Sequence, residues 1–181
     1  MDKRLPSDFT FSQYGLDVRL INETDSEFIV ALRTDSVLGR FINPTDTSVK
    51  EQINWVRKYK ERESAGTDYY FIYSSNGEPM GVNRIYDITT IEFTGGSFVF
   101  KKNSPFEIPV LATLIQLDIA FNMLGKEIMH GDVRLDNHKV LKFHKLLHIE
   151  FINRSDIDQY ILYRKETFNQ RKPIIESMLI E

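Results

Sequence analysis

The sequence contains no cysteine, one tryptophan, nine glycines and six prolines among its 181 residues. The absence of cysteine excludes a disulfide scaffold, a thiolate metal site and a cysteine nucleophile. The net charge of −3 provides no basic field of the kind that binds nucleic acid, so we expect no nucleic-acid partner. The longest apolar run, 108–124, contains Gln116, Asp118 and Asn122, which makes it a core helix rather than a membrane span.

What the chain does contain is typical of one globular domain. Hydrophobic residues make up 41% and charged residues 27% of the sequence, and a chain of this length can bury a sizeable core. Residues 1–14 show little pattern, so we expect an N-terminal arm (1–14) followed by a single domain (15–181). The N-terminus lacks the apolar segment of a signal peptide, and we therefore expect a cytoplasmic protein.

Hydrophobic periodicity and end signals predict the order of helices and strands. Capping boxes at residues 24–27 and 48–51 predict the starts of two helices, and Asn76-Gly77 predicts a hairpin. The predicted strands cover 16–20, 69–73, 80–88, 91–100, 128–134, 149–152 and 159–168. The predicted helices cover 25–34, 49–66, 109–124, 138–147 and 173–179, with Pro109 as the first residue of its helix. This order indicates a single-domain α+β fold with a central mixed, mostly antiparallel sheet flanked by helices.

The most informative segment is 127–151, EIMHGDVRLDNHKVLKFHKLLHIEF, which is predicted as strand, turn and helix. At 100° per residue, Asn137 and His144 lie in the apolar arc of the helix, whereas Lys139, Lys142 and Lys145 lie on the opposite side. Asn137 therefore begins a helix whose buried side carries His144, seven residues later.

This segment resembles the last conserved unit of the GNAT-superfamily N-acyltransferases, in which a strand is followed by Asn, six residues, and an aromatic residue or His. The hairpin of residues 69–82 and the run Gly96-Ser97-Phe98-Val99 also resemble the family, and the resemblance covers roughly residues 16–168. It implies a GNAT-like fold with acetyl-CoA as the acyl donor. It further implies that Asn137 contacts the cofactor and that His144 protonates the departing thiolate.

The resemblance also implies where the pantetheine arm binds. In the family, a wedge between two splayed strands takes this arm, whose amides pair with the strand backbone. By alignment, Phe98, Val99 and Phe100 line one side of the wedge, and residues 130–133 line the other. Ordinary core packing is the alternative role of Phe98 and Phe100.

Several fragments together resemble a narrower group, the acyltransferases of surface-polysaccharide gene clusters. These enzymes acylate the amino group of a nucleotide-linked amino sugar. The fragments are Leu32-Arg33, Phe41-Ile42-Asn43, Gln52-Ile53-Asn54-Trp55, Arg84-Ile85-Tyr86-Asp87, Gly96-Ser97, Asp132-Val133-Arg134 and Lys139-Val140-Leu141-Lys142-Phe143-His144. The resemblance implies that Arg84 and Asp87 hold the sugar and that Trp55 stacks on a sugar or base. A turn cap at Asp87 and core packing of Trp55 are the alternatives.

The sequence departs from the family pattern in three places. The family binds the CoA pyrophosphate on a glycine-rich loop, but residues 101–109 contain no glycine and two prolines. We expect Lys101, Lys102, Asn103 and Ser104 to compensate electrostatically. Thr94 stands where many members carry a catalytic Glu. His148-Ile149 stands where the family has Gly-Phe.

The base that deprotonates the amine must therefore come from elsewhere. Candidates are Asp87, His130 and Asp132; His130 and Asp132 share one strand face and form a possible proton relay or a surface hydrogen bond. His144 and His148 are spaced to chelate a metal, but spacing fixes no acidic partner, so we expect no metal.

We therefore predict an acetyl-CoA-dependent N-acyltransferase whose acceptor is a small-molecule amine, best matched by an amino group on a nucleotide-linked sugar. A non-catalytic module with a degenerate cofactor loop, and an enzyme acting on proteins or small amines, are the alternatives. A homodimer stays open.

Overall fold

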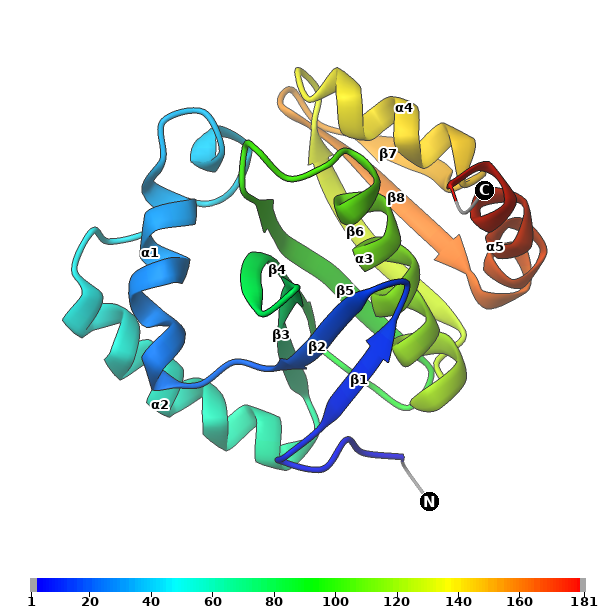
Figure 1. The fold of residues 1–181 in the computed structure, drawn as a ribbon. Coiled ribbons are helices and arrows are strands. Elements are labelled where there is room, and N and C mark those ends of the chain that lie inside the picture. The colour runs from blue at the N-terminus through cyan, green and yellow to red at the C-terminus, as the bar shows by residue number, and fades with distance from the viewer. Residues whose placement is uncertain (1–2, 180–181) are drawn as a thin grey trace.

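In a computed structural model that describes residues 3–179, the chain forms an eight-stranded sheet of order β1-β2-β3-β4-β5-β6-β8-β7 (Figure 1). Only β5 and β6 are parallel; the other neighbours are antiparallel. The strands are β1 (Thr10–Gln13), β2 (Leu16–Leu20), β3 (Asp68–Ser75), β4 (Glu78–Tyr86), β5 (Glu92–Phe100), β6 (Ile128–Arg134), β7 (Glu150–Arg154) and β8 (Asp158–Arg164). The predicted α+β class with a mixed, mostly antiparallel sheet is confirmed.

The helices cover both faces of this sheet. Helices α1 (Ser26–Thr34) and α2 (Val49–Ala65) lie on one side, and α3 (Glu107–Asp118), α4 (His138–Leu146) and α5 (Lys165–Leu179) lie on the other (Figure 1). Each face has its own hydrophobic core. After the ligands that the family resemblance leads us to expect on each side, we call them the acceptor face, under α1 and α2, and the donor face, under α3, α4 and α5. None of the helices within residues 3–179 combines the length and apolar character needed to cross a membrane.

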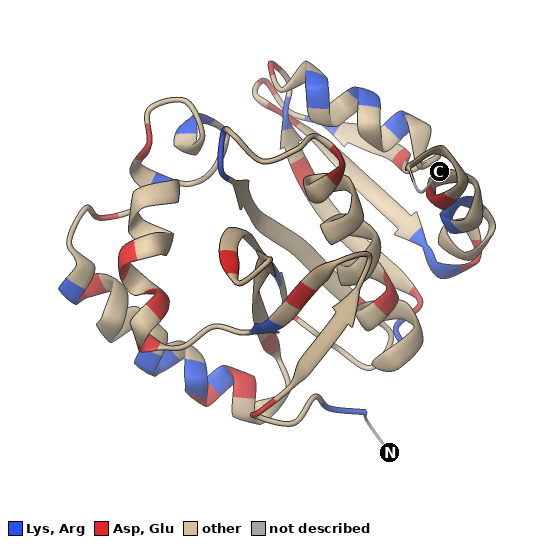
Figure 2. Ribbon diagram, in the orientation of Figure 1, with Lys and Arg blue, Asp and Glu red and all other residues tan. Residues whose placement is uncertain are grey.

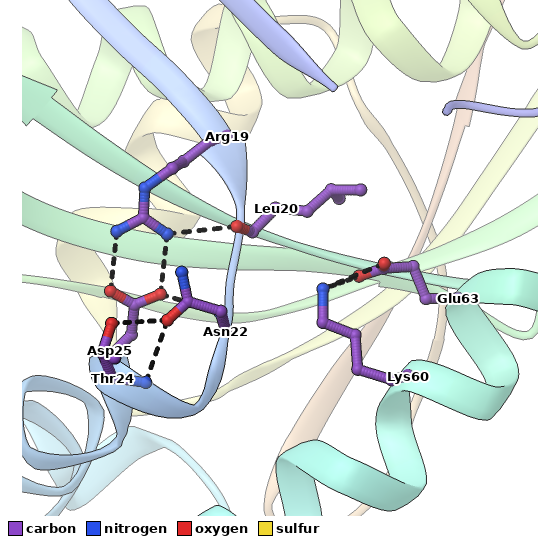
Figure 3. A network of polar contacts seen from close by, with 7 residues as sticks. All are labelled: Arg19, Leu20, Asn22, Thr24, Asp25, Lys60 and Glu63. Atoms are coloured by element: carbon purple, nitrogen blue, oxygen red, sulfur yellow. Dashed lines mark hydrogen bonds and ion pairs between the residues drawn. The ribbon is translucent and has the colours of Figure 1, made fainter. Parts of the chain in front are cut away.

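Specific contacts mark the start of α1, and a glycine marks the end of α2. Arg19 donates from both of its Nη atoms to Asp25, which ties β2 to the turn before α1, and Asn22 caps that turn (Figure 3). Lys60 and Glu63 form an ion pair within α2 in the same view. Gly66, at φ 76°, ends α2 in the left-handed conformation that glycine adopts without strain.

The chain ends differ from the predicted pattern. Strand β1 lies within the segment expected to be an arm, and it pairs with β2. Strand β8 stops at Arg164, and α5 begins at Lys165 and includes Pro173, so the predicted strand 159–168 and helix 173–179 are wrong in their bounds. Phe168 packs against Phe121 and Tyr163, and this burial offsets the hydrogen bond that Pro173 removes.

Helix α3 begins two residues before Pro109, the residue predicted to open it. Pro109 still lies in the first turn, where its missing N–H has no partner within the helix in any case. The helix continues through a π-helical turn, η3 (Ile119–Met123). The bounds of α2, β6 and α4 agree with the sequence patterns to within a residue.

Two irregularities in the middle of the sheet shape the cavity that is described in the next subsection. Strands β5 and β6 pair only over Glu92–Thr94 and Ile128–His130, and beyond these residues the two strands separate. In β5, Ser97 and Phe98 together oppose Asn83 of β4, which makes a β-bulge, and Ser97 has φ 50°. A bulge leaves backbone groups outside the ladder and aims nearby side chains in new directions.

Candidate active site

A cavity of about 430 Å³ passes through the wedge between β5 and β6. Its walls come from both faces of the sheet, so we call it the cleft. On the donor face it is lined by α3 and α4, and on the acceptor face by β4 and the loop that follows α1. Such a passage allows two ligands to approach one point from opposite sides.

The backbone of β5 is exposed to the cleft at two glycines. A Cβ on Gly96 would lie 3.0 Å from the ring of Tyr86, and a Cβ on Gly95 would lie 3.2 Å from Sδ of Met129. Gly95 and Gly96 stay paired with Ile85 and Arg84, but the bulge follows directly at Ser97, so the backbone of Ser97 and Phe98 lies outside the β4 ladder.

The donor wall carries His144 and Asn137, as predicted from their spacing. Burial lowers the pKa of His144 to about 4, and its Nδ1 has no hydrogen-bond partner among residues 3–179. The imidazole is therefore neutral at neutral pH. Asn137 Oδ1 accepts the N–H of Val140 at 3.4 Å as the cap of α4, which leaves its amide nitrogen for a ligand. Blue segments along α4 in Figure 2 mark the lysines of its other side.

Of the three aromatic and aliphatic residues predicted to line the wedge, only Phe98 does so. Val99 is buried in the acceptor-face core and Phe100 in the donor-face core. The ring of Phe100 fills the space over Gly81, where a Cβ would lie 2.2 Å from it. Val99 and Phe100 are core residues, so the structure gives their side chains no part in the lining.

The loop before α3 offers no glycine cradle, and its lysines are engaged. Lys101 pairs with Glu78 at 2.6 Å, and Lys102 pairs with Asp35 at 2.9 Å. Asp35 also accepts backbone hydrogen bonds from the loop after α1, so Lys102 links the two loops.

Asn103 and Ser104 occupy the turn of that loop. The Ser104 N–H is bonded to the carbonyl of Lys101 at 3.1 Å, which removes one donor from any anion site. Neither residue lines the cleft.

The acceptor wall is organised around Asp68, whose side chain is only 2% exposed. Asp68 accepts from Nε of Arg62 at 2.8 Å and from both Nε and Nη2 of Arg84. Both guanidinium groups lie over the ring of Trp55, at 5.3 and 5.1 Å from its centroid. Trp55 in turn stacks on Tyr59 at 5.6 Å. Arg84 and Trp55, predicted as substrate residues, are thus brought together. The same contacts fix the orientations of the Arg62 and Arg84 guanidinium groups.

Asp132 and Tyr86 meet at the acceptor side of the wedge, and both line the cleft. Burial, and then the neighbouring Asp158, raise the pKa of Asp132. Burial raises the pKa of Tyr86, and the charge of Asp132 adds to this rise. A carboxylate with a raised pKa next to the exposed β5 backbone has the chemistry of a general base.

Two predicted residues lie outside the cleft lining. His130 Nε2 lies 3.5 Å from Oε2 of Glu92, and no hydrogen bond joins His130 to Asp132 among the described residues. Asp87 is exposed at the end of β4, with φ 50°. Strand alternation did place His130 and Asp132 on one face, but only Asp132 reaches the wedge.

Sequence reasoning missed Tyr86, Arg33 and Gln116, which line the cleft, and Tyr70, which lines a second cavity beside Trp55. The signal for Tyr86 was present, because alternation puts it on the same face as Arg84 and puts Asp87 on the other. Gln116 donates to the carbonyl of Arg84 at 3.0 Å, a contact between α3 and β4 that no local pattern indicates.

Comparisons with known proteins agree with this geometry. The apo structure of FdhC, a nucleotide-linked sugar GNAT, is 30% identical, with a TM-score of 0.85 over 95% of this chain and 99% of that chain. Campylobacter jejuni N-acetyltransferase PseH in complex with acetyl coenzyme A is 20% identical, with a TM-score of 0.63 over 82% of this chain and 99% of that chain. The ribosomal-protein-S5-alanine acetyltransferase from Vibrio fischeri is 15% identical, with a TM-score of 0.73 over 88% and 98%.

The last two structures share the fold at identities that establish no more than the fold. No family model and no curated relative matches the chain. The wedge between β5 and β6, and 30% identity over nearly the whole length of both chains, show that this chain belongs to the GNAT superfamily of acetyltransferases.

Proposed function

We propose that the protein transfers an acetyl group from acetyl-CoA to the amino group of a nucleotide-linked amino sugar in the cytoplasm. The observation that carries the proposal is the cleft itself, which opens on both faces of the sheet and brings Asp132 and His144 to one passage. The similarity to FdhC, a nucleotide-linked sugar GNAT, supports this class of acceptor.

The residues of the donor face fit the pantetheine arm of acetyl-CoA. The separated backbones of β5 and β6 have lost their mutual ladder beyond Thr94 and His130, and they can pair with the arm's amides. The unpartnered Nδ1 of His144 and the amide nitrogen of Asn137 are polar groups suited to a ligand. The loop at 101–106 does not form the usual pyrophosphate cradle, so Lys101 and Lys102 act there as point charges.

Acetyl-CoA supplies an activated thioester, and the protein's groups move the proton, polarise the carbonyl and stabilise the departing thiolate. Asp132, directly or through a water, takes the proton that the attacking amine releases. A backbone N–H at the Ser97 bulge polarises the acetyl carbonyl. His144 is neutral, so it stabilises the departing thiolate as an N–H donor, since a thiol with pKa about 8.5 needs little acid assistance. Tyr86 contacts the sugar, and Arg84 contacts the nucleotide-linked acceptor beside it.

The alternative is a non-catalytic member of the fold, and the glycine-free loop favours it. Isothermal titration with acetyl-CoA, beside desulfo-CoA, distinguishes the two, followed by an assay of CoA release with amino-sugar nucleotides. We expect a Kd below about 100 μM and acceptor-dependent CoA release. No binding at millimolar acetyl-CoA would show that the fold has lost its enzyme function.

CoA release with peptide N-termini or polyamines, and none with amino-sugar nucleotides, would show that the protein is an acetyltransferase whose acceptor is not a nucleotide-linked sugar. The control protein is Arg57→Gln, which changes an exposed residue of α2 away from both cavities.

A further inference from the structure

A second cavity of about 430 Å³ lies beside Trp55, between α2, residues 44–46 and the central strands. It shares Arg33, Arg84 and Ser97 with the cleft, so the two spaces meet at these three residues. We call it the side chamber. Apart from these three shared residues, no residue of the side chamber has a role in the acetyl transfer proposed above, which leaves the chamber free for a part of the acceptor that does not react.

The junction between the cleft and the side chamber is cationic and rigid. Arg33 donates from Nε to Thr45 Oγ1 at 2.5 Å and from Nη2 to the carbonyl of Asn43 at 3.2 Å. Arg84 is held through its own Nε and Nη2 by Asp68. Each guanidinium thus keeps Nη1 without a partner among residues 3–179. Planar, oriented guanidinium groups are suited to phosphate oxygens.

Tyr70 provides an independent sign of a missing ligand. Its side chain is buried at the wall of the side chamber, and its hydroxyl has no hydrogen-bond partner among residues 3–179. Burial raises the pKa of Tyr70, and Arg33 and Ser97 oppose this rise from within reach of the hydroxyl on the junction side, although neither makes a hydrogen bond of normal geometry to it. A buried hydroxyl without a partner is costly, and a bound oxygen at the junction satisfies it.

The rest of the side chamber combines an aromatic residue with polar groups. Trp55 is fixed by its stack on Tyr59 and its edge contact with Tyr70. The polar lining contains both donors and acceptors: Thr45, Asp46, Glu51, Gln52, Asn54 and Lys58. Such a wall is suited to the hydrogen-bonding edge of a nucleobase and the hydroxyls of the nucleoside's sugar. A simple anion would leave most of these polar side chains without a contact.

We propose that the side chamber binds the nucleoside diphosphate of the acceptor. The diphosphate lies at the junction, on Arg33, Arg84 and the Tyr70 hydroxyl, and the nucleoside lies beside Trp55. The amino sugar then extends into the cleft toward Tyr86 and Asp132. This assignment rests on the proposed function, because it takes the acceptor to be a nucleotide-linked sugar.

Trp55 is the only tryptophan of the chain, so its fluorescence reports on the side chamber directly. We titrate the full-length protein with uridine 5′-diphosphate and thymidine 5′-diphosphate, neither of which carries the amino sugar. The heat of binding is measured in parallel by titration calorimetry. At least one is expected to bind saturably, and the corresponding nucleoside and inorganic pyrophosphate more weakly. Arg33→Gln is expected to weaken binding roughly tenfold.

Two further variants separate ligand binding from folding. Tyr70→Phe removes a hydroxyl that has no partner in the free protein, so it is expected to leave the Tm unchanged or higher and to weaken diphosphate binding about fivefold. Arg57→Gln, on the exposed side of α2, is expected to change neither quantity.

Each outcome of these titrations either supports or overturns the assignment of the side chamber. No diphosphate binding in a protein that still binds acetyl-CoA overturns the assignment and leaves acetyl transfer standing. Diphosphate binding that Arg33→Gln and Tyr70→Phe leave unchanged also overturns it, because the nucleotide then lies elsewhere. Diphosphate binding sensitive to both variants, in a protein that neither binds acetyl-CoA nor releases CoA, supports the side chamber and overturns the proposed function instead.

Discussion

At the acceptor end of the cleft, Arg62 and Arg84 converge on one buried carboxylate, Asp68, whereas at the donor end Lys101 and Lys102 each make a single pair near the surface. The acceptor arginines are also packed on Trp55, and the donor lysines lie on a loop whose Phe106 is 73% exposed. The two ends therefore differ in how firmly they hold their charges.

The difference follows from what each ligand needs. A buried, multiply bonded ion network fixes guanidinium orientation, and this suits recognition of one acceptor among many. Exposed pairs contribute little and rearrange easily. Under the proposed function the donor needs less from its loop, because the separated strands β5 and β6 leave backbone groups with which the pantetheine arm is proposed to pair.

The largest expected effect tests the chemistry at the acceptor side. Asp132→Asn removes the proposed base and is expected to lower kcat roughly 100- to 10,000-fold, with little change in acetyl-CoA binding. His130→Gln, two residues away on the same face, is expected to cost less than about threefold, because His130 does not line the cleft. Steady-state kinetics of both variants check this. An equal loss in both would restore the predicted His130–Asp132 relay.

The pH profile follows from the raised pKa of Asp132. The carboxylate must be ionised to accept a proton, so kcat/KM falls as the pH falls through a pKa higher than that of an ordinary aspartate. This acid limb is expected to vanish in the residual activity of Asp132→Asn.

The second effect tests the rigidity of the acceptor end. Asp68→Asn leaves two guanidinium groups without their shared carboxylate and is expected to lower the free energy of unfolding by about 3 kcal/mol. Denaturant unfolding measures it. The matched control, Glu23→Gln, breaks the exposed pair with Arg57 and is expected to change the stability far less, because solvent screens an exposed pair. Equal costs would remove the contrast between buried and exposed pairs.

A third measurement probes the donor wall. The pKa of His144 is about 4 in the folded protein, below its ordinary value of 6.5, so the unfolded state binds more protons between these values. Stability is therefore expected to fall as the pH falls from 6.5 to 4, by roughly 2–3 kcal/mol from this residue. Urea unfolding across this range, compared with His144→Gln, isolates the contribution, which should be absent in the variant.

The donor loop gives a smaller effect. Lys102→Ala removes a charge from the predicted pyrophosphate region and is expected to raise the KM for acetyl-CoA about fivefold at low salt. Acetyl-pantetheine lacks the phosphates, so its KM is expected to stay the same. If both KM values rise together, Lys102 acts through its pair with Asp35 and the acceptor loop instead.

The smallest effect concerns the end of α4. His148 has φ 60°, a conformation that costs a residue with a Cβ about 1 kcal/mol or more. His148→Gly is expected to raise the free energy of unfolding by about 1 kcal/mol, in thermal or urea unfolding. His148→Ala keeps the Cβ and is expected to give no such gain.

His148 also illustrates what a local pattern can predict. The resemblance places glycine at this position, and His148 has the left-handed backbone that glycine adopts without strain. In the same way, the spacing of Asn137 and His144 predicted a capped helix with a histidine on its inner side, and in the structure Asn137 caps α4 and a half-buried His144 lines the cleft. These features depend on residues within a few turns of one another.

The wedge lining shows where a local pattern fails. Up to Gly96, β5 alternates between faces, but the bulge places Ser97 on the acceptor face as well, next to Tyr70. The alternation is then reversed, so Phe98 and Phe100 belong to the donor face and Val99 to the acceptor face. A single extra residue, invisible in the hydrophobic pattern, thus decides which side chains meet the cleft.

The sequence by itself determined the order of elements from β2 onward, the α4 cap with its histidine, and the glycine-free donor loop, because hydrophobic period, caps and turns act over a few residues. Only the tertiary structure decided that Asp68 gathers Arg62 and Arg84, that Asp132 rather than His130 reaches the wedge, and that Tyr70 borders the side chamber. These groups come from separate elements, and sheet pairing, strand separation and burial bring them together. Burial also sets the pKa of His144, which no residue pattern contains.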